Sequence, residues 1–118
     1  MDTTILLIIN DAPYGTEKAY NALRLARTLQ KEAAADIRIF LLADAVGCAL
    51  PAQKTADGYY NVARMLRAVL NGGARVKACG TCLEARGMRE LTLLDGVEPA
   101  TMKDLAAWVT ECDRVITF

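Results

Sequence analysis

Apolar residues along the chain fall into continuous runs and into stripes with helical spacing. The run at residues 4–9 is rich in β-branched residues and lacks the period-2 alternation of a half-exposed strand, and residues 37–42 are predicted to form a second strand. Such runs are typical of strands that are buried on both faces of a parallel sheet. Shorter runs at 74–78 and 114–118, with a short strand expected near Val97, bring the predicted strands to five.

Two long helical patterns separate the first three of these strands. The first helix is expected to begin after Thr16, which is placed to act as its N-cap. The second ends at the Asn-Gly-Gly sequence of residues 71–73, a strong C-terminal stop signal. The apolar stripes of the two helices are Ala19, Leu23, Ala26 and Leu29, and Val62, Met65, Leu66 and Val69.

Two capping-box patterns predict further helices in the second half of the chain. The pattern at 81–84 predicts a short helix with Thr81 as its N-cap, and the pattern at 101–104 opens a longer one. The short helix is expected to stop at Gly87, and a helical turn is expected near residues 90–94.

The alternation of strands and helices predicts an α/β fold. We expect a three-layer sandwich with a five-stranded, mainly parallel sheet in the flavodoxin-like order 2-1-3-4-5. Sites in such sheets form outside the carboxyl ends of the strands, at the switch point between the first and third strands. The loops at residues 10–16, 44–49 and 79–82 are predicted to meet there. A length of 118 residues fits one domain.

Composition and charge exclude several classes of function. The 14 basic and 14 acidic residues cancel, so no net field directs the protein toward nucleic acid or an anionic membrane. No apolar run approaches the roughly 20 residues that span a bilayer, and Asp2 stands where a signal peptide would be basic. A cytoplasmic location follows, in which the four cysteines are expected to be thiols.

The segment from Cys79 to Cys82 is the main candidate for chemistry. A C-x-x-C spacing is found in redox dithiols, in zinc sites and in sulfur-handling nucleophiles. The chain has no histidine, so zinc would need Cys48 and Cys112 or carboxylates as further ligands. Because Cys112 is expected at the opposite edge of the sheet, we predict no metal site. No glycine-rich phosphate loop occurs, and no cofactor is expected.

The position of the pair favours an activated thiol. A cysteine between a strand and a helix N-terminus faces unpaired backbone N–H groups and the positive end of the helix dipole, which lower the pKa of a thiol. Lys77 and Arg86 lie nearby in the sequence. Spacing alone does not choose between Cys79 and Cys82 as the nucleophile.

The remaining candidates are weighed against plain packing. Cys112 is predicted to be a core residue, because free cysteine is often buried, whereas for Cys48 packing and participation are equally expected. Polar residues at the ends of the first two strands complete the predicted pocket, although such residues are common in loops. The pocket residues are Asn10, Asp11, Tyr14, Asp44, Cys48, Gly80 and Thr81.

The segment at residues 76–87 resembles the DsrE/DsrF-like family of small sulfur-relay proteins, which includes YchN-like and TusD-like members. Asn10-Asp11 after the first strand and the closing segment from Met102 to Phe118 support the resemblance. It spans essentially the whole chain and implies a single DsrE/DsrF-like domain over residues 1–118. It also implies a flavodoxin-like fold and assembly into homotrimers or homohexamers.

The resemblance implies a specific role for one cysteine. In the relay members, a cysteine eight residues before the glycine that closes the short helix accepts sulfane sulfur as a persulfide. Cys79 and Gly87 match this pattern, so Cys79 is expected to take sulfur from a donor protein and pass it to an acceptor protein. TusD-like proteins lack an equivalent of Cys82, which is expected to resolve a Cys79 persulfide or to modulate it.

Two alternatives remain beside persulfide transfer. The first is a dithiol redox protein that cycles a Cys79–Cys82 disulfide, although the Trp and Pro usual around such a pair in thioredoxin-like proteins are missing. The second is a non-catalytic oligomeric subunit that binds a ligand or a partner at the switch point.

Overall fold

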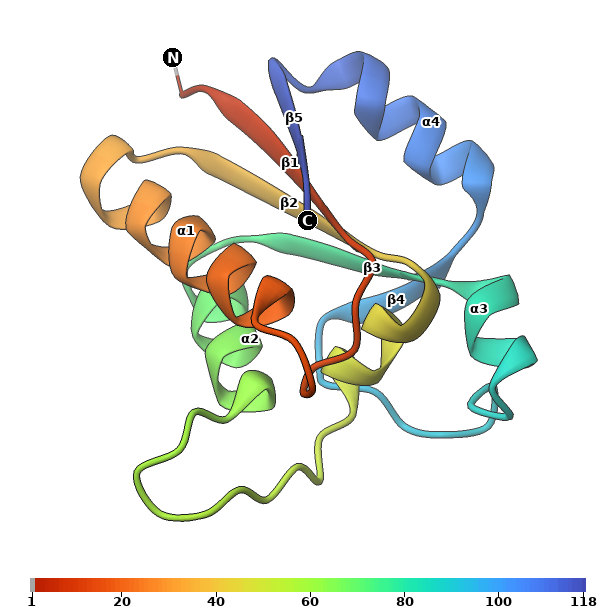
Figure 1. Cartoon of the computed structure of the whole chain (residues 1–118). Coiled ribbons are helices and arrows are strands. Elements are labelled where there is room, and N and C mark those ends of the chain that lie inside the picture. The colour runs from red at the N-terminus through yellow and green to blue at the C-terminus, as the bar shows by residue number, and fades with distance from the viewer. Residues whose placement is uncertain (1) are drawn as a thin grey trace.

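The computed structural model describes residues 2–118, and its five strands in this range form one parallel sheet (Figure 1). The strands are β1 (Thr4–Ile9), β2 (Asp36–Leu41), β3 (Arg75–Cys79), β4 (Val97–Ala100) and β5 (Arg114–Thr117). All four strand pairings are parallel. The predicted α/β class and parallel sheet are therefore confirmed.

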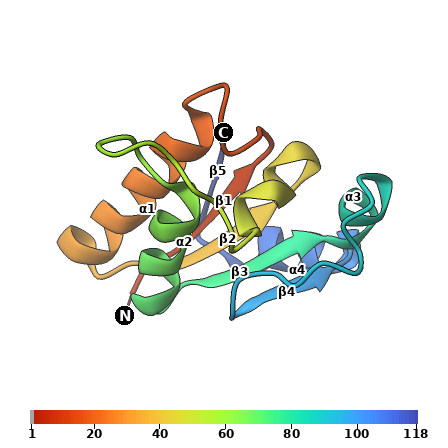
Figure 2. The ribbon, with the colours of Figure 1, turned by 90° about the horizontal axis from the view of Figure 1, so that it is seen from below.

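The helices form the outer layers of the sandwich. Helices α1 (Lys18–Ala33) and α2 (Val62–Asn71) cover one face of the sheet, and α4 (Met102–Glu111) covers the other (Figure 2). A 3₁₀-helix, η1 (Ala43–Ala49), follows β2, and the short helix α3 (Gly80–Ala85) follows β3.

The strand order differs from the predicted 2-1-3-4-5. It is β4-β3-β2-β1-β5, so β1 pairs with β2 and β5, and β2 separates it from β3. The predicted order would place α1 and α2 on opposite faces, because right-handed crossovers that run in opposite directions do so. Instead the two helices pack together on one face, where the Gln30 side chain of α1 donates to the Val69 carbonyl of α2 at 2.9 Å.

This order also moves the switch point of the sheet. The chain reverses its direction of advance between β1 and β5, so the switch point lies there and not between β1 and β3. The loop after β1 contacts the end of β5 there, since the Asn10 side chain donates to the Phe118 carbonyl at 3.1 Å. Cys79 lies at the carboxyl end of β3, beside the edge strand β4.

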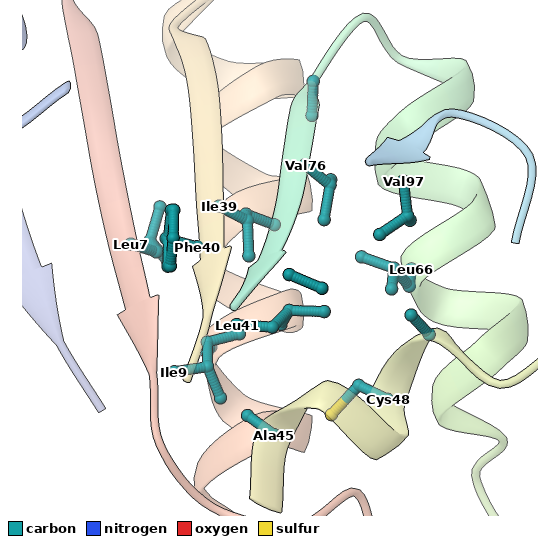
Figure 3. Packing of buried hydrophobic residues seen from close by; sticks show 14 of the residues in the cluster. Leu7, Ile9, Ile39, Phe40, Leu41, Ala45, Cys48, Leu66, Val76 and Val97 are labelled. Carbon is teal, nitrogen blue, oxygen red and sulfur yellow. The ribbon is translucent and has the colours of Figure 1, made fainter. Parts of the chain in front are cut away.

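The core is built from apolar side chains on both faces of the sheet. Figure 3 shows Ile39 and Leu41 of β2 close to Val76 of β3, with Leu66 of α2 nearby. On the face covered by α4, Phe40 meets the buried Trp108 edge to face, with ring centroids 6.2 Å apart. The central strands are thus buried on both faces, as their continuous apolar runs predict.

The N-caps of two helices differ from the predictions. Glu17 occupies the N-cap position of α1, without a side-chain cap; the Thr16 hydroxyl accepts from the Lys18 amide at 3.4 Å. Cys79, and not Thr81, is the N-cap of α3. Strand β3 extends through Cys79, and the Cys79 sulfur accepts from the Cys82 amide.

Three other local expectations can be compared with the structure. The capping box of α4 is confirmed, with Thr101 and Asp104 bonded reciprocally. Residues 44–49 form most of η1 instead of a loop. Residues 90–94 hold no helical turn; a turn closed by the Leu91 amide and the Met88 carbonyl begins before them, and one closed by the Val97 amide and the Leu94 carbonyl ends after them.

No helix within residues 2–118 is both long enough and apolar enough to cross a membrane.

Candidate functional site

Cys79 holds two structural positions at once: it is the last residue of β3 and the N-cap of α3. Its sulfur accepts a hydrogen bond from the Cys82 amide at 3.3 Å, in place of the oxygen that usually caps a helix. The Thr81 hydroxyl lies 3.2 Å from the same sulfur and donates to it when Cys79 is a thiolate. The donors of this short turn therefore converge on one atom.

These donors decide the ionisation of Cys79. Burial acts to raise the pKa of its thiol, but hydrogen bonds from the Cys82 thiol and the Thr81 hydroxyl, together with those from backbone amides, outweigh burial. The pKa of Cys79 consequently lies below its ordinary value. A thiolate is the nucleophilic form of cysteine, so the geometry favours Cys79 as the reactive member of the pair.

Cys82 has the opposite tendency. Burial raises the pKa of its thiol, and its hydrogen bond to the Cys79 sulfur raises it further. The Ala43 amide opposes this by donating to the Cys82 sulfur at 3.2 Å. When the pair holds a single proton, that proton is therefore favoured on Cys82, and Cys79 is the thiolate.

An ion pair joins the C-terminal end of α3 to η1. The Arg86 Nε donates to Asp44 Oδ1 at 2.8 Å, and Arg86 Nη1 donates to the Cys82 carbonyl at 3.1 Å. Ala43, at the start of η1, has a left-handed φ of 50°, which alanine rarely adopts, and this conformation accompanies its contact with Cys82. The segment after β2 thus contacts the cysteine pair through the Ala43 amide, whereas Asp44 reaches α3 through Arg86.

A pocket of about 320 Å³ opens beside Cys79. Cys79 is only 5% exposed, and its accessible side faces this pocket. A Cβ on Gly80 would lie 3.2 Å from the Ala100 carbonyl oxygen, so glycine permits the close approach of α3 to β4. The lining residues are Cys79, Gly80, Thr81, Arg89, Pro99, Ala100, Thr101, Met102 and Asp104.

Two pocket residues, Arg89 and Asp104, are not among the site residues predicted from the sequence. Arg89 lies in an irregular segment without a local signal. Asp104 is recognisable as a capping residue, and helices after parallel strands begin at the carboxyl edge of the sheet. The register that pairs Cys79 with Ala100 brings the start of α4 to the pocket.

The remaining predicted pocket residues make their contacts elsewhere. Asp11 accepts from the Thr16 hydroxyl at 3.1 Å, and the Tyr14 hydroxyl donates to Gln53 Oε1 at 2.6 Å. Asn10 bonds to Phe118 near β5. Because β2 lies between β1 and β3, the loop after β1, which carries these residues, is separated from α3 by η1 (Figure 1).

The other two cysteines are not placed for the same chemistry. Cys48 of η1 is fully buried among the apolar residues of Figure 3, and burial raises its pKa to about 12. Cys112 caps the C-terminus of α4 and is half-buried; burial raises its pKa, against the charge of Arg38. Within residues 2–118 no group of three or more His, Cys, Asp or Glu side chains could hold a metal ion.

The two cations near the motif act at different places. Lys77 Nζ lies 4.6 Å from the centroid of the Trp108 ring, over the face covered by α4. The charge of Arg86 acts on Cys82, where it lowers the pKa. Hydrogen bonds, more than these cations, therefore set the ionisation of Cys79.

Comparison with known proteins agrees with the architecture. The family model described as DsrE/DsrF-like matches residues 3–118. The chain belongs to the DsrE/DsrF-like family. Its cysteine pair, at the end of β3, lies within the matched range.

Members of the DsrE/DsrF-like family resemble the chain along almost its full length. Protein YchN of Escherichia coli K12 is 44% identical over 115 residues, which cover 97% of each chain. Uncharacterized protein MK0008 of Methanopyrus kandleri is 45% identical over 114 residues, covering 97% of this chain and 93% of its own. The crystal structure of E. coli YchN superposes with a TM-score of 0.91 at 41% identity, covering 100% of both chains.

A more distant neighbour shares the fold. The protein of unknown function MTH1491 from Methanobacterium thermoautotrophicum has a TM-score of 0.74 at 19% identity, and covers 99% of this chain and 100% of its own.

Proposed function

We propose that the protein is a sulfur-relay protein that accepts sulfane sulfur on Cys79 and passes it on as a persulfide. The observation that carries this proposal is the thiolate-favouring environment of Cys79 at the edge of an open pocket. Membership of the DsrE/DsrF-like family supports it. The donor and the acceptor are proposed to be proteins that present a persulfide and a thiol.

The transfer needs no outside oxidant or reductant. The Cys79 thiolate attacks the terminal sulfur of a donor persulfide; a new S–S bond forms, and the donor's S–S bond breaks. The electron pair of that bond leaves on the donor's inner sulfur, which departs as a thiolate. An acceptor thiolate then attacks the terminal sulfur on Cys79, which restores the Cys79 thiolate.

We also propose that the chain works as a homotrimer or homohexamer. The resemblance to the family supports this, and so do the exposed apolar side chains Met102, Val109 and Val115 in the last part of the chain. Sedimentation equilibrium is expected to give a molar mass three or six times that of the 12.8 kDa chain, whereas a monomer at micromolar concentration would contradict the proposal.

A second candidate function is favoured by one contact. The Cys82 amide donates to the Cys79 sulfur at 3.3 Å, so the two cysteines meet within one short turn. Once Cys82 loses its proton, it can attack the inner sulfur of a Cys79 persulfide. A Cys79–Cys82 disulfide then forms, hydrosulfide leaves with the electron pair, and an external dithiol must reduce the disulfide before the next cycle.

Intact-mass spectrometry of single-cysteine variants tests the first proposal. The reduced protein is incubated with a persulfide donor, and the mass of one added sulfur atom is followed. Wild type and Cys82→Ala are expected to gain this mass, and Cys79→Ala is expected to show no gain. In Cys82→Ala the adduct should also last longer if Cys82 resolves it.

Two results would decide against sulfur relay. Undiminished loading of Cys79→Ala would remove Cys79 as the acceptor. Absence of any adduct on wild type, with all four thiols inert to alkylation in the native state, would instead favour a non-catalytic binding subunit.

A further inference from the structure

The pocket beside Cys79 carries one side chain of each charge on apolar walls. Arg89 is its cation and Asp104 is its anion, while Pro99, Ala100 and Met102 supply apolar surface. At about 320 Å³ the pocket lies at the small end of the range for small-molecule sites. A ligand that complements it is a small zwitterion with a short apolar body.

Arg89 is free to turn toward such a ligand. Its side chain is 63% exposed, and its one ion pair, to Glu84 Oε2, is long at 3.4 Å. Exposed pairs of this kind contribute little, so their loss on ligand binding costs little. A Cβ placed on Gly80 would lie 4.0 Å from Arg89 Nη1, which puts the guanidinium against the turn that carries Cys79.

Asp104, the anion of the pocket, is held in its charged form. Its Oδ2 accepts from the Thr101 amide at 2.8 Å and from the Thr101 hydroxyl at 3.0 Å. These hydrogen bonds, together with the charges of Lys77 and Lys103, lower the pKa of the carboxyl group. Both bonds fall on Oδ2, so Oδ1 can accept from a ligand ammonium group.

We propose that the pocket accepts a free amino-acid persulfide, of which cysteine persulfide is the simplest, as a direct sulfur donor to Cys79. Arg89 binds its carboxylate, Asp104 binds its ammonium group, and the methylene and sulfur atoms lie on the apolar wall. This inference rests on the proposed function, because it names a substrate for the same thiolate. Arg89 and Asp104 are then the residues that determine donor specificity.

The chemical step balances with the donor alone. The Cys79 thiolate attacks the terminal sulfur of the amino-acid persulfide, R–S–SH; a new S–S bond forms, and the S–S bond of the donor breaks. The products are a Cys79 persulfide, which keeps the proton, and the thiolate of the free amino acid, which carries away the electron pair.

Three donors of similar size that differ in charge test the inference. They are L-cysteine hydropersulfide, 3-mercaptopropionate hydropersulfide, which lacks the ammonium group, and 2-hydroxyethyl hydropersulfide, which lacks both charges. The initial rate of sulfur addition to the reduced full-length chain is measured by intact mass. Wild type is expected to be loaded fastest by the zwitterion and slowest by the neutral donor.

Matched variants assign the two charges. Arg89→Gln should lower the ratio of the 3-mercaptopropionate rate to the 2-hydroxyethyl rate about fivefold, the effect of one exposed charge pair. Asp104→Asn should lower the ratio of the cysteine rate to the 3-mercaptopropionate rate by a similar factor, while its amide oxygen can still cap α4. Arg64→Gln, the same change on exposed α2, should leave both ratios as in wild type.

The outcomes separate this inference from the proposed function. If all three donors load wild type equally and Arg89→Gln leaves the ratios unchanged, the pocket does not select a zwitterion, although Cys79 still accepts sulfur. If none of the three small donors loads wild type, this inference fails, whereas the proposed function still stands when a protein that carries a persulfide loads Cys79. If Arg89→Lys keeps the wild-type ratios and Arg89→Gln loses them, the positive charge at residue 89 is what selects the donor. Loss of the ratios in Arg64→Gln would contradict the assignment.

Discussion

At the scale of single residues, Cys79 joins two roles that are usually separate. A helix N-cap normally accepts with a serine, threonine, asparagine or aspartate oxygen. Here the sulfur of Cys79 takes that place, so the amide that closes the first turn of α3 also stabilises a thiolate. A local structural requirement and chemical activation are met by the same contact.

The four cysteines are expected to differ sharply in reactivity, and Cys48 gives the clearest test at this scale. Its pKa of about 12 leaves almost no thiolate at pH 8, and it is fully buried. Iodoacetamide should therefore alkylate Cys48 more than about a thousandfold more slowly in the native protein than in urea.

Peptide mapping after timed alkylation measures this difference for each cysteine. Cys112 is the internal comparison, since it is half-buried and should react in the native state at a measurable rate. Native labelling of Cys48 as fast as that of Cys112 would contradict the buried position of η1.

At the scale of elements, the site depends on how η1 is held against α3. The Asp44–Arg86 ion pair joins them, and Arg86 also bonds to the Cys82 carbonyl. Both side chains are partly exposed, so the pair is expected to contribute at most about 1 kcal/mol to stability. The pair also bears on Cys82: burial raises the pKa of that thiol, and the charge of Arg86 acts in the opposite direction.

A double-mutant cycle separates these two effects. Asp44→Ala, Arg86→Ala and the double variant, in a Cys79→Ala background, should show a coupling free energy of at most about 1 kcal/mol in urea unfolding. Arg86→Ala should raise the alkylation midpoint of Cys82 on the pH scale, whereas Arg64→Ala should not. A midpoint that stays fixed in Arg86→Ala would show that Arg86 does not act on Cys82.

The sequence predicts such local features well where a single pattern determines them. The box at Thr101 and Asp104 forms as expected, because its two hydrogen bonds need only four consecutive residues. The similar pattern that begins at Thr81 does not form a capping box. Strand β3 extends through Cys79, and the Cys79 sulfur accepts from the Cys82 amide instead. A competing pairing between strands decided the position of that cap.

At the scale of the whole molecule, long-range pairing limits what the sequence predicts. Both β1 and β2 are mostly apolar and mostly buried, so their patterns do not say which of them is central. The order depends on α1 and α2 packing together, a contact between residues far apart in the chain. The α/β class follows from the pattern, whereas the position of the switch point does not.

The candidate site divides in the same way. Cys79, Gly80, Thr81 and Cys82 are adjacent in the sequence, so their shared turn could be predicted from spacing. Arg89 and Asp104 reach the same pocket only because β4 pairs with β3. Asn10, Asp11 and Tyr14 were expected there from a strand order that the sheet does not have.

The pH dependence of Cys79 reactivity tests the central claim most directly. Alkylation rates of Cys79 and Cys82 are measured separately, by fragmentation of the peptide that contains both, from acidic to alkaline pH. The Cys79 midpoint is expected below that of an ordinary thiol, about 8.5, and below that of Cys82. In Cys82→Ala it should move upward, because one donor to the thiolate is lost. A Cys79 midpoint at or above that of an ordinary thiol, or ionisation of Cys82 first, would contradict the assignment of Cys79 as the nucleophile.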